Sequence, residues 1–295
     1  MKRIPTAVRL SFGLALLANT VSLIAAPLKI ACIGDSITEG AGLSSPSTES
    51  YPARLQKLLG ATHIVRNYGV SGRTLLKKGD FPYWKEAAYT QSRSWAPDVV
   101  VIKLGTNDSK PYNWKYSTNF VSEFEEFIGS YRALPSKPRV ILCTPAPVYS
   151  KGAFDISPGI IATNIAPAVR DLAARLGIEV MDYHTRLAGH PEWFPDTVHP
   201  NTRGMAVMAA IAFGILQNLP ADDTEIRVGA SLSATKRPVL AWPTERAVFV
   251  LQTATRVDGT NALWTVADAI PATDGSRLLL TNSTASPRFF RLWRP

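Results

Sequence analysis

Residues 28–38 read LKIACIGDSIT. The mostly apolar run 28–33 stops at Gly34, so it predicts a short β-strand. A strand without polar alternation is typical of a parallel sheet covered on both faces. Ligands in open parallel sheets bind beyond the carboxyl ends of the strands. Ser36 therefore stands where a nucleophile could act, although an ordinary helix-capping serine would give the same local pattern. The alternation along the strand directs Asp35 away from Ser36.

Strand-like and helix-like segments continue to alternate up to about residue 218. This alternation predicts a parallel sheet with helices on both faces. We expect Pro167 to kink the longest helix, because proline removes a helical hydrogen bond. The expected strands cover residues 28–33, 63–68, 99–104, 139–143 and 178–181. The expected helices cover residues 51–59, 120–131, 160–176 and 202–216.

Two further strand ends carry residues that could bind an anion. Residues 67–74 read NYGVSGRT, in which Gly72 would let the backbone approach a ligand closely. Residues 105–108 read GTND, and the side-chain amide of Asn107 could donate a hydrogen bond to a developing oxyanion. Each stretch is equally compatible with a plain turn, since glycine and asparagine are common turn residues.

Asp196 and His199 are three residues apart, and Pro200 follows directly. A residue before proline avoids helical geometry, so both side chains are expected on a loop. Such a loop can hold the carboxylate against one imidazole nitrogen and leave the other nitrogen for a serine hydroxyl. A zinc site is disfavoured, because it needs three or four ligands and the sequence has no compact set of histidines and cysteines. Asp182, after the last expected strand, is the alternative carboxylate.

These stretches resemble, in order, the four signature blocks of the SGNH (GDSL-type) hydrolase family, at residues 34–36, Gly72, residues 105–108 and residues 196–199. The resemblance spans roughly residues 28–218 and is closest to bacterial sialate O-acetylesterase-like proteins and other carbohydrate acetylesterases. It implies an α/β protein, a three-layer α/β/α flavodoxin-like sandwich. Its five-stranded parallel sheet would have the strand order 2-1-3-4-5.

The resemblance also implies a role for each block. Ser36 would be the nucleophile of a Ser-His-Asp triad, with His199 as the base and Asp196 behind the imidazole. The backbone N–H groups of Ser36 and Gly72 and the side chain of Asn107 would form the oxyanion hole.

The activity implied in this way is that of a serine esterase. It would hydrolyse O-acyl esters of carbohydrates, above all O-acetyl esters, through an acyl-enzyme and without a metal or organic cofactor. A lysophospholipase or arylesterase on the same fold is the alternative, and a non-catalytic glycan-binding protein is the third hypothesis. The expected partner is a small-molecule or glycan ester. Aromatic rings can stack on sugar rings, so Trp84, Trp114 and Trp193 are candidate substrate-binding residues.

The first residues have the composition of an export signal. Three basic residues precede an apolar run from residue 10 to residue 26, which ends in small residues before Pro27. This pattern predicts a signal peptide over residues 1–26 and an exported protein, periplasmic or extracellular. A transmembrane anchor is the alternative, but the run is too short and interrupted, since a span needs about 20 apolar residues. We expect no stable membrane insertion.

The formal net charge is +9, and it is +6 without the three basic residues of the leader. The remaining charges are dispersed along the chain. Nucleic-acid binding requires a clustered basic patch, so no nucleic-acid partner is expected. The sequence carries no signal for the oligomeric state.

Residues 27–220 form the expected hydrolase domain, residues 221–224 a linker and residues 225–295 a small β-rich, fibronectin-like module. The module is predicted from short β-branched runs separated by turn signals. In the implied strand order, the strands that carry Cys32 and Cys143 flank a third strand. Their spacing of about 10 Å exceeds what a disulfide allows. We therefore expect two buried free thiols.

Overall fold

A computed structural model describes residues 26–150 and 153–217, together with seven strands between residues 229 and 293. The expected signal peptide, apart from Ala26, lies outside these residues. Five parallel strands form the central sheet in the order β2-β1-β3-β4-β5, which confirms the predicted flavodoxin-like α/β class. The strands are β1 (Leu28–Gly34), β2 (His63–Gly69), β3 (Val99–Lys103), β4 (Arg139–Cys143) and β5 (Glu179–Met181).

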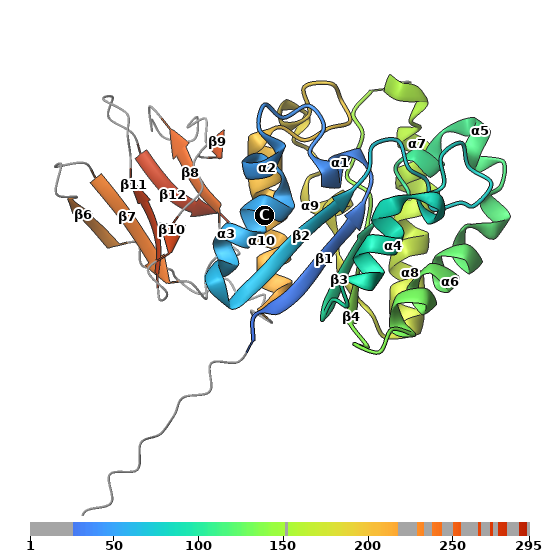
Figure 1. Ribbon diagram of the computed structural model, residues 1–295. Helices are drawn as coiled ribbons and strands as arrows, with labels where there is room; N and C mark the ends of the chain where they lie inside the picture. Colours follow the sequence, from blue (N-terminus) through green and yellow to red (C-terminus); the bar gives the residue numbers. More distant parts are fainter. Residues whose placement is uncertain are drawn as a thin grey trace, which may run out of the picture.

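Helices cover both faces of this sheet (Figure 1). Alternate residues of β1 point to opposite faces, so that Cys32 belongs to one apolar core and Ile33 to the other. Helices α3 and α10 close the first core, and α6 and α8 close the second. Of the described helices, none is long and apolar enough to cross a membrane. The helices are α1 (Ser36–Glu39), α2 (Pro46–Glu49), α3 (Tyr51–Leu59), α4 (Ala87–Ser94), α5 (Pro111–Trp114), α6 (Phe120–Arg132), α7 (Pro158–Ile160), α8 (Ala166–Leu176), α9 (Tyr183–Arg186) and α10 (Thr202–Leu216).

The helix expected over residues 160–176 is divided in the structure. Helix α7 ends at Ile160, a π-helical turn spans Ile161–Ile165, and α8 begins at Ala166. Pro167 lies in the first turn of α8. The wider π turn relieves the clash between a proline ring and the carbonyl group four residues earlier. The helix is thus interrupted by a π turn just before the proline, a common site of helix bending, and the kink itself stays a prediction.

Both cysteines are buried and free, as predicted. Cys32 lies on β1 and Cys143 on β4, and β3 lies between these two strands. Burial raises the pKa of the Cys32 thiol to about 12 and holds the pKa of Cys143 well above its usual value. Since the thiolate is the reactive form, both thiols are inert core residues.

The strands described beyond residue 228 pair only in antiparallel fashion, within two small sheets. One sheet has the order β10-β11-β7-β6, and the other has the order β12-β8-β9. The expected linker lies outside the described residues, and the fibronectin-like character of this part stays a prediction. These strands are β6 (Gly229–Leu232), β7 (Pro238–Pro243), β8 (Val250–Ala254), β9 (Thr265–Val266), β10 (Ala272–Thr273), β11 (Arg277–Thr281) and β12 (Phe289–Trp293).

Candidate active site

Ser36 is the first residue of α1, directly beyond the carboxyl end of β1. Asp35 caps this helix, because its Oδ1 accepts a hydrogen bond from the N–H of Ile37 at 3.0 Å. Gly34 permits the close packing of the turn, since a Cβ there would lie 2.8 Å from the carbonyl oxygen of Lys103. The turn leaves Ser36 7% exposed at the edge of the sheet.

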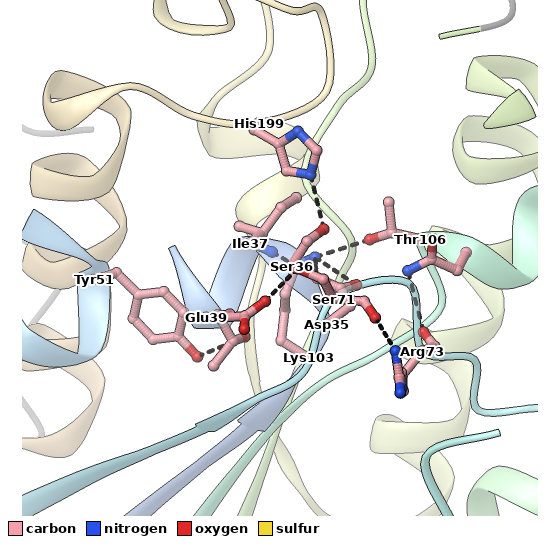
Figure 2. A network of polar contacts seen from close by, with 12 residues as sticks. Asp35, Ser36, Ile37, Glu39, Tyr51, Ser71, Arg73, Lys103, Thr106 and His199 are labelled. Carbon is pink, nitrogen blue, oxygen red and sulfur yellow. Dashed lines mark hydrogen bonds and ion pairs between the residues drawn. The ribbon is translucent and has the colours of Figure 1, made fainter. Parts of the chain in front are cut away.

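His199 and Asp196 extend from the loop before α10 and continue a hydrogen-bond chain from Ser36. The Nε2 atom of His199 lies 2.8 Å from Ser36 Oγ, and Figure 2 shows the imidazole pointing at this hydroxyl. The Nδ1 atom of His199 lies 2.6 Å from Asp196 Oδ2. The three side chains that the sequence singled out therefore meet in one chain of hydrogen bonds.

The backbone of the loop fixes the Asp196 carboxylate. Its Oδ1 accepts hydrogen bonds from the N–H groups of Val198 at 3.0 Å and His199 at 2.7 Å, and Thr197 adopts a left-handed φ of 72° to make this turn. Partial burial by itself raises the pKa of Asp196, but the hydrogen bonds from His199 and Val198 outweigh it, and the pKa lies below its usual value. An ionised carboxylate at Nδ1 holds the proton there and leaves Nε2 to accept a proton from Ser36.

Asp182, the alternative carboxylate, belongs to a different cluster. It accepts hydrogen bonds from the Arg170 guanidinium at 2.9 and 3.0 Å and from Thr144 Oγ1 at 2.9 Å. It also caps helix α9 through the N–H of Thr185. Asp182 therefore joins the start of α9 to Arg170 on α8 and to Thr144 after β4. Asp196 is the carboxylate that lies against His199.

Asp196→Asn is expected to lower kcat for ester hydrolysis by about 10³–10⁴-fold, because an amide favours the wrong imidazole tautomer. Asp182→Asn is the matched control and should keep kcat within about threefold of the wild type, since Asp182 bonds Arg170 instead of His199. Initial rates with p-nitrophenyl acetate measure both effects. Equal losses in the two variants would contradict the assignment of Asp196.

The lowered pKa of Asp196 also predicts a pH effect on stability. A carboxyl group with a lower pKa in the folded state stabilises the fold above its unfolded-state pKa, and this contribution is lost as the pH falls through the folded-state value. The Tm difference between wild type and Asp196→Asn should shrink as the pH falls below about pH 4. Scanning calorimetry measures this difference, and a gap that widens on acidification would refute the prediction.

The expected oxyanion-hole residues lie on the two turns that flank Ser36. Gly72 has a φ of 80°, which favours glycine. Asn107 is 4% exposed, and its Nδ2 donates to the carbonyl of Arg73 at 3.1 Å, which joins the two turns. An amide has two N–H donors, so one remains for a ligand. Their role as oxyanion donors stays a prediction.

Asp108 stabilises the segment that follows Gly72. Its carboxylate accepts hydrogen bonds from the N–H groups of Leu75 at 3.0 Å and Leu76 at 2.7 Å. Burial raises the pKa of Asp108 to about 7, although these two backbone hydrogen bonds act in the opposite direction. The GTND stretch therefore supplies both the candidate donor Asn107 and the side chain that holds the neighbouring turn.

A buried ion pair under the nucleophile was not anticipated from the sequence. Asp35 points away from the Ser36 hydroxyl, as expected, and both of its oxygens accept hydrogen bonds from Lys103 Nζ, at 2.9 and 3.0 Å. Both side chains are completely buried. The sequence did carry one indication of this pair. Lys103 is a lone charge between Ile102 and Leu104 in an apolar strand, and a buried charge requires a partner.

The three tryptophans proposed for substrate binding occupy different environments. Trp193 is 3% exposed and stacks on His190 with ring centroids 3.8 Å apart, so its ring offers little free surface, and its contact with a substrate stays a prediction. It packs into the core under α10, which the sequence pattern could not reveal. Trp84 donates its indole N–H to the carbonyl of Leu75 at 2.7 Å, and Trp114 packs edge-on against Phe120. Their substrate contacts stay predictions.

Phe154 is an aromatic residue beside the site for which the sequence carries no signal. It is 57% exposed, and its ring lies edge-on to the His199 imidazole with centroids 5.3 Å apart. The backbone of Phe154 has a left-handed φ of 56°, a conformation that residues other than glycine rarely adopt. Phe154 therefore presents an apolar surface beside the candidate base.

The strand order and the hydrogen-bond chain at Ser36 define an SGNH-type hydrolase fold. The chain belongs to the GDSL-like lipase/acylhydrolase family, whose model matches residues 32–207. This confirms the family that the signature blocks indicated.

Similar proteins carry esterase names. An acetylxylan esterase from Xylanibacter ruminicola is 39% identical over 217 residues, which cover 66% of this chain and 45% of that protein. The chain thus spans less than half the length of this relative. A carbohydrate acetylesterase family member from Sinorhizobium meliloti is 23% identical, covers 65% of this chain and 98% of its own, and has a TM-score of 0.54. An aryl esterase from M. smegmatis is 19% identical, covers 65% of this chain and all of its own, and also has a TM-score of 0.54. The two solved structures support the fold.

Proposed function

We propose that the protein is a serine esterase that removes O-acyl groups, above all O-acetyl groups, from carbohydrates. One observation carries the proposal: Ser36 Oγ lies 2.8 Å from His199 Nε2, and the opposite nitrogen of that ring lies 2.6 Å from Asp196. This is the geometry in which an imidazole activates a serine hydroxyl.

The reaction begins when Ser36 Oγ attacks the ester carbonyl carbon and its proton passes to His199 Nε2. The resulting oxyanion accepts hydrogen bonds from the N–H groups of Ser36 and Gly72 and from the Asn107 amide. The tetrahedral intermediate then expels the sugar oxygen, which takes the proton from His199 and leaves as an alcohol. Acetyl-Ser36 remains.

Water completes the cycle by the same steps. His199 takes a proton from the water as its oxygen attacks acetyl-Ser36, and this proton then passes to Ser36 Oγ as acetic acid leaves and ionises in solution. Asp196 stays ionised and holds the imidazolium that forms in each half of the reaction. The chain's own side chains supply every proton transfer in this scheme.

The substrate class is supported by the relatives and by Phe154. The similar proteins include an acetylxylan esterase and a carbohydrate acetylesterase family member. An exposed aromatic ring beside the base suits a pyranose ring, whose C–H groups can pack against an aromatic face. Because an aryl esterase is among the similar structures, small aryl esters are an alternative substrate class.

Acetate release from acetylated xylo-oligosaccharides tests the substrate class, and a chain-length series of p-nitrophenyl esters tests the acyl group. We expect acetate release and a preference for acetate over octanoate esters. A preference for octanoate would favour a lysophospholipase. Hydrolysis of aryl acetates without release from any acetylated glycan would favour an arylesterase, and activity unchanged by Ser36→Ala would favour a glycan-binding protein.

Phe154→Ala is expected to raise KM for acetylated xylo-oligosaccharides about 3- to 10-fold, as expected for losing one aromatic contact of about 0.5–1.5 kcal/mol. KM for ethyl acetate, which has no ring, should change little. Val121→Ala is the control, since Val121 is a 39% exposed apolar residue on α6. Equal effects on both substrates would show that Phe154 positions His199 rather than the sugar.

We further propose that the protein is exported after removal of residues 1–26. The support is the basic, apolar and small-residue order of the N-terminal stretch. Mass spectrometry of the protein recovered from the periplasm or the medium tests this proposal. A mature form that begins near Pro27 is expected, and a chain that keeps its first residues and stays inside the cell would refute it.

A further inference from the structure

Lys103 is the last residue of β3, and its side chain is completely buried. Its register partner on β1 is Gly34, so the lysine lies directly beside the turn that carries the nucleophile. Its ammonium group has three N–H donors and three acceptors within 3.0 Å: Asp35 Oδ1 at 2.9 Å, Asp35 Oδ2 at 3.0 Å and Thr106 Oγ1 at 2.8 Å. The cation is therefore fully coordinated by protein groups.

The two partners of Lys103 belong to two different parts of the site. Asp35 caps the helix that begins with Ser36, through its bond to the N–H of Ile37. Thr106 directly precedes Asn107, the candidate oxyanion donor. Figure 2 shows this junction, with dashed contacts that run from the Lys103 ammonium group to Asp35 and Thr106 close to Ser36. One ammonium group thus connects the nucleophile turn to the oxyanion turn.

The charges around this junction give Lys103 a second effect. Asp35 is a carboxylate adjacent to Ser36, and Asp108 is another fully buried carboxyl group nearby, whose pKa Asp35 helps to raise. Without a cation, the Asp35 carboxylate would oppose the negative charge that develops on the substrate carbonyl. Electrostatic interactions are strong in such a water-poor environment, so the position of a single cation matters.

We propose that Lys103 is a positioning residue for ester hydrolysis: its buried ammonium group holds the Ser36 turn and the Asn107 turn in register and offsets the Asp35 charge beside the forming oxyanion. The inference rests on the proposed esterase function. It predicts that the network affects the chemical step more than substrate binding, because nothing in it touches the substrate.

Thr106 offers the mildest test. Thr106→Val deletes only the hydroxyl that accepts from Lys103 and keeps the shape of the side chain, and Thr106→Ser is the matched control that keeps the hydroxyl. For p-nitrophenyl acetate we expect kcat to fall about tenfold in Thr106→Val with KM within about twofold, and both constants to stay near wild type in Thr106→Ser. Equal kcat values in the two variants would overturn the proposal that the bond between Lys103 and Thr106 positions the site.

The ion pair itself is tested by a charge-matched exchange. Lys103→Met alone leaves the Asp35 charge buried and unpaired, so this variant is expected to fold poorly. The double variant Asp35→Asn, Lys103→Met removes both charges and keeps a helix-capping side chain, which can preserve stability. Its Tm should lie closer to wild type than that of Lys103→Met. Its kcat should fall about 10- to 100-fold at nearly unchanged KM.

The control for removing a lysine ion pair is Lys77→Met, which breaks a surface pair with Glu126 and should leave kcat unchanged. A folded double variant with kcat within twofold of wild type would overturn the proposal, since Lys103 would then only balance a buried charge. If the double variant does not fold, the Thr106→Val and Thr106→Ser pair decides. A wild-type protein without ester hydrolysis would instead refute the proposed function.

Discussion

Ser36→Ala is expected to lower kcat for ester hydrolysis by about 10⁵-fold, close to the largest losses that single substitutions cause in serine hydrolases. The variant cannot form acetyl-Ser36, so only the contribution of binding and oxyanion stabilisation remains. The exchange removes one oxygen atom at a site that is 7% exposed, and the fold should tolerate it. Initial rates with p-nitrophenyl acetate and direct acetate release measure the loss.

Ser92→Ala is the matched control for this experiment. Ser92 is also a buried serine, and its hydroxyl bonds Tyr131 at 2.8 Å on the helical layer that contains α4 and α6. Its loss should reduce stability slightly and leave kcat unchanged. Labelling by a fluorophosphonate should disappear in Ser36→Ala and persist in Ser92→Ala. Ser36→Ala activity above about one per cent of wild type would exclude Ser36 as the nucleophile.

His199→Ala is expected to cause a loss of similar size, about 10⁵-fold in kcat, because the serine hydroxyl then has no base. The two residues act as a unit, so the double variant Ser36→Ala, His199→Ala should be no less active than either single variant. Additive losses in the double variant would show that the two side chains act in separate steps.

His190→Ala provides the comparison. His190 also pairs with a carboxylate, through Nδ1 and Glu192 at 3.0 Å, and it lies only nine residues before His199. The His190 ring stacks on Trp193, whereas the His199 ring is the one that bonds the Ser36 hydroxyl. We expect His190→Ala to keep kcat within about threefold, with a lower Tm from the lost stacking. A large kcat loss in His190→Ala would mean that the loop as a whole, and not His199, determines the rate.

Much of the site could be predicted because its signals are local. Asp196 and His199 are three residues apart, so a single turn is enough to bring carboxylate and imidazole together. The strand over residues 28–34 and its glycine are visible as an apolar run with a stop, and Ser36 follows it. Parallel strands end at the same edge of their sheet, and this rule brings the signature blocks together from a one-dimensional pattern.

The tertiary structure alone decided features that depend on packing between distant segments. Ser36 and His199 are 163 residues apart, and only the fold sets their side chains 2.8 Å from each other. Lys103 and Asp35 are 68 residues apart, and their pairing follows from the register between β1 and β3. The local sequence around each of these two residues does not indicate its partner.

Burial separated the aromatic residues in the same way. Trp193 and Phe154 both follow loop-like sequence, yet Trp193 is 3% exposed and Phe154 is 57% exposed. The sequence by itself determined the sheet, its four longest helices and the residues that gather at its edge, because periodicity and turn chemistry act over a few residues. Which side chain is covered, and which charge meets its partner, was decided by the fold, because exposure depends on what packs from the other side.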